Sequence, residues 1–125
     1  MYTLDKYIKD SEIQIKWPND ILVNNHKISG ILIETTVLKE KIKKVIIGVG
    51  ININQVQFSF TENNPTSIKK ILKKEFDKQV VLMDFLKFFS QLFDYFKEKK
   101  YEFLDQEYLI FLRDSSQFFK NRNAN

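Results

Sequence analysis

The segment between Lys43 and Asn54 constrains the fold more than any other part of the chain. Its residues alternate with a period of two, which is typical of a β-strand whose two faces have different surroundings. One face is continuously apolar and carries Val45, Ile47, Val49, Ile51 and Ile53. The opposite face carries Ile46, Gly48, Gly50, Asn52 and Asn54. The pattern predicts a sheet whose apolar face is covered by helices.

The second face of this strand lacks side chains at Gly48 and Gly50. Glycine weakens a strand, so two of them indicate close approach of a ligand or of another backbone. A flat ligand could lie on the two glycines, with the amide of Asn52 bonding to its polar edge. A β-bulge or a sharp bend is the alternative interpretation. The segment is not a dinucleotide-binding fingerprint, because a third glycine is absent and no helix follows directly.

The stretch before this strand holds the only tryptophan and the only histidine of the chain. Proline cannot donate a ladder hydrogen bond, so Trp17-Pro18-Asn19-Asp20 predicts a bend between two strands. Asn24-Asn25 lies between two apolar runs and predicts a tight hairpin. This arrangement would bring Asn19 and Lys27 together, close to the backbone of Gly30. Such a site suits an anionic ligand, and a plain surface hairpin with a few charges is the alternative.

The remaining pattern predicts an α+β fold with a mostly antiparallel four-stranded sheet. Short turns make consecutive strands antiparallel neighbours. The strands are expected at residues 13–16, 21–23, 27–38 and 43–54. A domain is expected over residues 1–112, followed by a polar tail over residues 113–125.

Three helices are expected to follow the sheet and to pack on its apolar face. Thr66 or Ser67 is the expected cap of the first. Asp84 is the expected cap of the second, which reaches Lys97. The third is expected from about Tyr101 to Leu112, with its apolar side chains turned inward.

Composition excludes several classes of protein. There is no cysteine, so neither a disulfide framework nor a cysteine-based metal site is available, and no cluster of histidine and carboxylates predicts a metal site. The net charge is +4, but the lysines are spread over the polar sides of several elements, so nucleic-acid binding is not expected. No apolar run approaches the roughly 20 residues of a membrane span, and a cytoplasmic protein is expected. The single His26 is expected to be a turn residue.

Three motifs together resemble the biotin–protein ligases, also called biotin–[acetyl-CoA-carboxylase] ligases. They are KWPND at residues 16–20, KISGILIE at residues 27–34 and GVGIN at residues 48–52, in the order and at the spacing of that family. The resemblance covers roughly residues 13–111 and corresponds to the second half of a class II synthetase-like catalytic domain. It implies formation of biotinyl-AMP from biotin and ATP, with Mg²⁺ accompanying the ATP. It also implies transfer of biotin to a lysine of a partner such as the biotin carboxyl carrier protein.

The resemblance also implies roles for individual residues. Lys27 would contact the carboxylate of biotin and then the adenylate, and is the expected catalytic residue. Gly30, Ile31 and Leu32 would line the biotin side, and the ATP side would be formed by Asn19, Gly48, Gly50 and Asn52. Strict alternation places Lys27 and Gly30 on opposite faces of their strand, so a bulge at Ser29-Gly30, or contact through the backbone alone, is needed to reconcile them. Asp20 is expected to orient its neighbours.

Forming an acyl-adenylate requires no nucleophile from the protein. An oxygen of the acid attacks the α-phosphate of ATP, and the protein screens charge and holds the geometry. Family members carry a Gly/Arg-rich loop before KWPND and a small β-barrel after the catalytic domain, and neither occurs in these 125 residues. The chain is therefore expected to need a missing N-terminal half for activity. A lipoate–protein ligase and a non-catalytic interaction module are the alternative functions.

Overall fold

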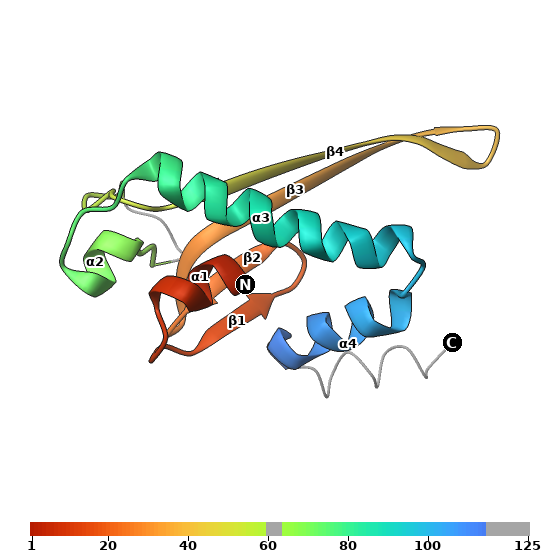
Figure 1. Cartoon of the computed structure of the whole chain (residues 1–125). Helices are drawn as coiled ribbons and strands as arrows, with labels where there is room; N and C mark the ends of the chain where they lie inside the picture. Colours follow the sequence, from red (N-terminus) through yellow and green to blue (C-terminus); the bar gives the residue numbers. More distant parts are fainter. Residues whose placement is uncertain (60–63, 115–125) are drawn as a thin grey trace.

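The computed structural model describes residues 1–59 and 64–114, and it has one four-stranded sheet accompanied by helices (Figure 1). The strands are β1 (Ile13–Lys16), β2 (Asp20–Val23), β3 (His26–Leu38) and β4 (Lys41–Ile51). They lie in the order β1-β2-β3-β4, and each neighbouring pair is antiparallel. The predicted α+β class and the four-stranded antiparallel sheet are confirmed. Most of the predicted polar tail lies outside the described residues.

Two tight hairpins set the order of the strands. Asn24 and Asn25 have φ angles of 48° and 65° between β2 and β3, and Lys39 and Glu40 have 48° and 62° between β3 and β4. Two consecutive left-handed residues form the turn whose twist matches that of paired strands. The hairpin predicted at Asn24-Asn25 is thereby confirmed. The Asn24 side chain also ties this turn to the residue before β1, because its Oδ1 accepts a hydrogen bond from the backbone N–H of Glu12 at 3.0 Å.

The helices are α1 (Tyr2–Tyr7), α2 (Ile68–Leu72), α3 (Lys78–Lys97) and α4 (Tyr101–Phe111). Ser67 caps α2 as predicted, since its hydroxyl accepts a hydrogen bond from the N–H of Lys70 at 3.1 Å. The predicted cap at Asp84 is wrong. Asp77 caps α3, and its carboxylate accepts from the N–H of Gln79 at 2.8 Å. The helix therefore begins at Lys78, before the expected start at Asp84.

Asp84 instead joins α3 to α1. Its carboxylate binds the Lys6 ammonium at 2.7 Å and accepts a hydrogen bond from the Tyr7 hydroxyl at 2.5 Å. Burial and the hydrogen bond to Asp84 raise the pKa of Tyr7 to about 12. The hydrogen bonds from Lys6 and Tyr7 lower the pKa of Asp84. A short N-terminal helix is thus fixed to the longest helix by polar contacts as well as by packing.

The core lies where β1, β2 and the start of β3 meet the helices. Its buried residues are Leu4, Ile8, Ile15, Ile21, Val23, Ile28, Ile68, Val81 and Leu112. The edge of β1 is covered in part by the end of α4, because the N–H of Arg113 donates to the carbonyl of Ile15 at 2.8 Å. Among the described residues no helix combines the length and the apolar character needed to cross a membrane.

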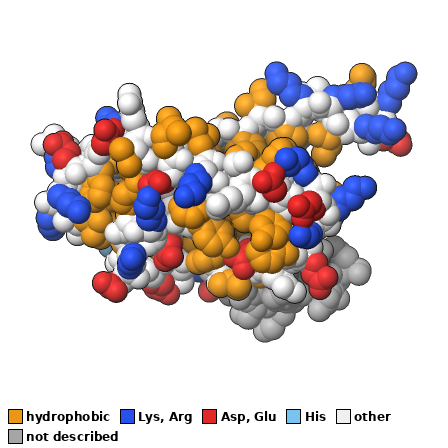
Figure 2. Space-filling view, in the orientation of Figure 1, with side chains coloured by type: hydrophobic (Ala, Val, Ile, Leu, Met, Phe, Trp, Pro, Cys, Tyr) orange, Lys and Arg blue, Asp and Glu red, His pale blue; other side chains and the backbone are white. Residues whose placement is uncertain are grey.

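The outer part of the β3–β4 hairpin, residues 33–47, projects away from this core and is called the arm below (Figure 1). Its apolar side chains are exposed and include Ile33, Val37, Leu38, Ile42, Val45, Ile46 and Ile47. Basic side chains gather at the end of the arm (Figure 2). The expectation that helices cover the whole apolar face of the last strand is therefore wrong. They cover its inner end, where Ile51 and Ile53 pack against the core.

The exposed arm predicts self-association of the chain at micromolar concentration, because open strand edges and contiguous apolar surface favour association. Sedimentation velocity should show concentration-dependent species above the monomer. The double substitution Val37→Lys and Ile42→Lys on the arm should shift the distribution toward monomer. Ile110→Lys, at an isolated exposed position on α4, is the matched control and should leave it unchanged. A monodisperse monomer of the parent chain would contradict the prediction.

Candidate functional site

A β-bulge in β3 brings Lys27 to the face that carries Gly30. Ile21 pairs with Ser29 and Leu22 pairs with Lys27, so Ile28 is an extra residue between them. The bulge that the sequence required is present, one residue before the expected Ser29-Gly30. A Cβ atom on Gly30 would lie 3.6 Å from Lys27 Nζ, so the lysine side chain runs over this glycine.

Asp20 is the charged neighbour of Lys27. It begins β2 directly opposite Gly30, and its Oδ1 lies 2.7 Å from Lys27 Nζ. The side chains of Lys27 and Asp20 are 32% and 16% exposed. The expectation that Asp20 orients its neighbours agrees with this ion pair. Asp20 was not among the expected site residues, although its position directly after the predicted bend already placed it beside the Lys27–Gly30 segment.

All three glycines of the chain lie together on this face. Gly30 pairs with Gly50, and Leu32 pairs with Gly48. None of the glycines has a positive φ, and an added Cβ would meet no atom closer than 3.6 Å. The pairing of β3 with β4 is also regular here, since its shift lies between Thr36 and Val37. A bulge or bend at Gly48 and Gly50 is thus excluded, and neither backbone conformation nor packing requires glycine.

The three expected biotin-side residues do not share one face. Leu32 lies beside the glycines and is 60% exposed, because it faces Gly48 across the ladder. Ile31 points to the opposite face and packs against the core. Ile31 therefore presents only its backbone to the surface that carries Gly30 and Leu32, since successive side chains of a strand alternate between faces.

Asn52 follows β4 and uses most of its polar groups within the fold. Its backbone N–H donates to the carbonyl of Ile28 at 2.9 Å, and its carbonyl accepts from the N–H of Ile68 at 3.1 Å. Its side-chain Nδ2 donates to the carbonyl of Thr66 at 3.0 Å. Asn52 therefore fastens the start of α2 to the end of the sheet. Its side-chain oxygen and the second N–H of Nδ2 are left for a ligand.

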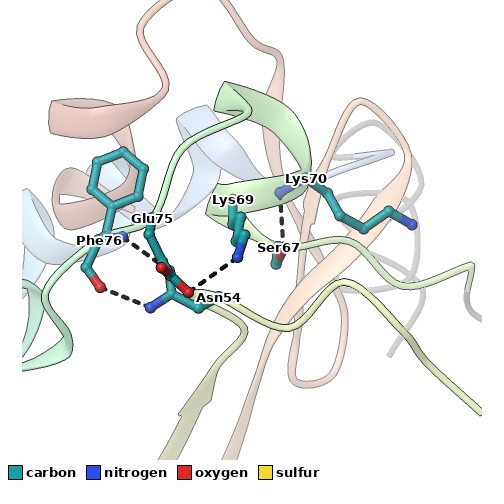
Figure 3. Close-up of polar contacts among 6 residues, drawn as sticks. All are labelled: Asn54, Ser67, Lys69, Lys70, Glu75 and Phe76. Atoms are coloured by element: carbon teal, nitrogen blue, oxygen red, sulfur yellow. Dashed lines mark hydrogen bonds and ion pairs between the residues drawn. The ribbon is translucent and has the colours of Figure 1, made fainter.

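Asn54 has a similar structural role, which Figure 3 shows. Its Nδ2 donates to the carbonyl of Phe76 at 2.7 Å, and its Oδ1 accepts from the N–H of Phe76 at 3.0 Å. Beside it Lys69 and Glu75 form an ion pair at 3.0 Å. The two asparagines thus hold the segment around α2 at the end of β4, next to the glycine-bearing face.

Asn19 lies in the exposed turn between β1 and β2. Its carbonyl accepts a hydrogen bond from the N–H of Ile31 at 2.8 Å. It lines a cavity of about 590 Å³ on the helix side of the sheet, together with Ile31, Val49 and Phe85. The residue that the bend presents to the Lys27 ammonium is Asp20.

His26 was expected in the turn and is the first residue of β3, directly after it, with its Nδ1 2.7 Å from the carbonyl oxygen of Asn24. In residues 1–59 and 64–114 no group of three histidine, cysteine or carboxylate side chains could hold a metal ion.

The candidate site is an open strip of strand backbone, formed by Gly30, Gly48 and Gly50, with the Lys27 ammonium at its end. Such a strip can receive a flat ligand and stabilise a negative charge beside Lys27.

The chain is similar to known proteins in sequence and in structure. The sequence model of the biotin/lipoate A/B protein ligase family matches residues 1–52. The bifunctional ligase/repressor BirA of Bacillus subtilis is 36% identical over 83 residues, which are 64% of this chain and 26% of that protein.

Solved structures of a biotin protein ligase from Aquifex aeolicus are also similar. The apo structure superposes with a TM-score of 0.75 and 28% identity, over 90% of this chain and 48% of that one. The complex with biotin and ATP superposes with a TM-score of 0.63 and 32% identity, over 78% of this chain and 40% of that one. The chain thus spans between a quarter and a half of the length of these proteins. The resemblance to the biotin–protein ligases is confirmed, and the similarity extends over part of the length of these proteins.

Proposed function

We propose that this chain forms part of a biotin–protein ligase. The enzyme would join biotin to ATP to give biotinyl-AMP and pyrophosphate. It would then pass biotin to a lysine of a carrier protein, such as the biotin carrier of acetyl-CoA carboxylase. The observation that carries the proposal is the strip of three glycines, which nothing in the protein's own packing requires and which ends at Lys27.

The strip suits biotin because its backbone is open to close contact. The fused rings would lie across Gly30 and Gly48, with Leu32 providing apolar contact beside them. The carboxylate at the end of the biotin chain would then meet the ammonium of Lys27. Gly50 and the side-chain oxygen of Asn52 lie further toward α2, where they would contact the nucleotide.

Lys27 would act by electrostatics alone. A carboxylate oxygen of biotin attacks the α-phosphate, a new phosphorus–oxygen bond forms, and pyrophosphate leaves. An ammonium beside this junction stabilises the negative charge that both groups share in the transition state. Mg²⁺ would enter with ATP as part of the substrate, and we assign it no residue among those described, because they offer no cluster of metal ligands.

Titration of the ¹⁵N-labelled chain with a non-hydrolysable biotinyl-AMP analogue tests the proposal. NMR detects weak binding, which is what one face of a site should give. We expect amide shifts at Gly30, Gly48 and Gly50, and none at the helix residue Phe85 on the opposite side of the sheet.

The lipoyl analogue should cause smaller shifts at the same concentrations. A larger response to the lipoyl analogue would replace biotin by lipoate as the substrate. Shifts confined to the helix side of the sheet, or no shifts, would contradict the proposed site and favour a non-catalytic interaction module.

Gly50→Ala should separate folding from ligand binding. The added methyl group meets open space, its nearest neighbour being the carbonyl oxygen of Gly30 at 4.0 Å. Stability against urea should stay the same or rise by up to about 1 kcal/mol, because alanine lowers the entropy of the unfolded chain. The analogue-induced shifts should be lost. Thr36→Ala on the arm is the control and should preserve them. A large loss of stability in Gly50→Ala would show that the glycine is structural.

Lys27→Ala should remove the main charge stabilisation. The measurement uses the Aquifex aeolicus ligase with its matching segment replaced by this chain, assayed for biotinyl-AMP formation. Loss of one preorganised donor costs on the order of 3 kcal/mol, so the rate should fall roughly a hundredfold. Lys27→Arg should recover little, because a planar guanidinium does not replace a compact ammonium. Lys16→Ala lies outside the strip and should have a smaller effect. A Lys27→Ala rate within about threefold of the parent rate would contradict the role.

A further inference from the structure

We infer that Asp20 is a positioning residue, which holds the ammonium of Lys27 above Gly30 before any ligand arrives. This role rests on the proposed function, because Lys27 is the lysine assigned to the reaction. The fixed position of the Lys27 side chain can nevertheless be measured without any ligand.

The location of the pair is unusual within the described part of the chain. It is the only ion pair described there in which both side chains are less than one-third exposed. By contrast, Asp94 and Lys97 on α3 have the same separation of 2.7 Å, but their side chains are 57% and 59% exposed. Partial burial reduces screening by water, so Asp20 acts on Lys27 more strongly than a surface partner would.

Two independent features of the backbone place the Asp20 side chain beside Lys27. Asp20 is paired directly with Gly30, and the bulge at Ile28 turns Lys27 toward the same glycine. Both charged groups lie over Gly30, at 3.6 Å for Lys27 Nζ and 3.8 Å for Asp20 Oδ1 from the position that a Cβ would occupy. The pair therefore spans the end of the glycine strip.

Such a contact orients the lysine and still leaves it able to bind. A lysine side chain is flexible, and ordering it costs conformational entropy that a ligand would otherwise have to offset. An ammonium has three N–H donors. One is directed at Asp20, so two are left for the carboxylate and phosphate of a ligand on the strip. Asp20 thus fixes the direction of the donors before binding.

A purely structural role for Asp20 predicts something different. An ion pair that only stabilised the fold would also order Lys27 and change the unfolding midpoint, but its loss would leave the affinity for a ligand unchanged. The order of the Lys27 side chain therefore tests the contact, and affinity for a ligand separates the two roles.

The experiment uses the full 125-residue chain with ¹³C-labelled lysine. Relaxation of the Lys27 Cε group reports its order, which should exceed that of Lys97 in the parent chain. Asp20→Asn, which keeps the shape and removes the charge, should lower the order of Lys27 to the level of exposed lysines. Asp94→Asn is the matched control and should leave Lys27 unchanged. Asp20→Glu keeps the charge on a longer side chain and should restore part of the order.

The second measurement is affinity for the biotinyl-AMP analogue. Asp20→Asn should weaken it roughly tenfold, as expected when one charge-assisted hydrogen bond is misdirected. Asp94→Asn should not change it. A Lys27 side chain as mobile in the parent as Lys97, or unaffected by Asp20→Asn, would overturn the inference, and so would unchanged affinity. An ordered Lys27 in a parent chain that binds no analogue would instead count against the proposed function alone.

Discussion

The pairing of β2 with β3 around one extra residue is the constraint on which the site depends. Because Ile28 occupies the bulge, it is fully buried in the core, while Lys27 and Gly30 share the opposite face. A strand with strict alternation could not satisfy both demands. The extra residue Ile28 therefore places its own side chain in the core and the Lys27 ammonium at the end of the glycine strip.

The two faces of the sheet have separate tasks. On one face, the side chains of Ile31, Ile51 and their neighbours pack against the helices and fix the sheet. On the other face, glycine removes side chains where a ligand is proposed to lie. Asn52 and Asn54 link the helices to the face that carries the glycines, because their side-chain amides hold α2 and the start of α3 at the end of β4. A change in either asparagine would therefore act on the site through the backbone around it.

Local patterns in the sequence predicted the strands, the hairpin turn at Asn24-Asn25 and the cap at Ser67, because short-range sterics and hydrogen bonding determine these features. The motif resemblance predicted Lys27 and the glycines. Other outcomes depended on contacts between distant segments. Asp84 is as suitable a cap as Asp77 by residue type, and only its contact with α1 explains why it lies inside α3. The amide of Asn52 is engaged by Thr66, and no local pattern predicts that partner.

The geometry also explains how much of a ligase site this chain can supply. A ligand resting on the strip touches the protein on one side only, whereas small-molecule sites usually bury about 70–90% of the ligand surface. Under the proposed function, the described residues would determine the orientation of biotin and the position of one charge, and surfaces that close over the strip would supply most of the binding energy. Orientation and charge act mainly on the transition state, whereas enclosure acts on both states. Substitutions at Lys27 and Asp20 should accordingly affect catalysis in a complete site more than they affect the weak binding of the isolated chain.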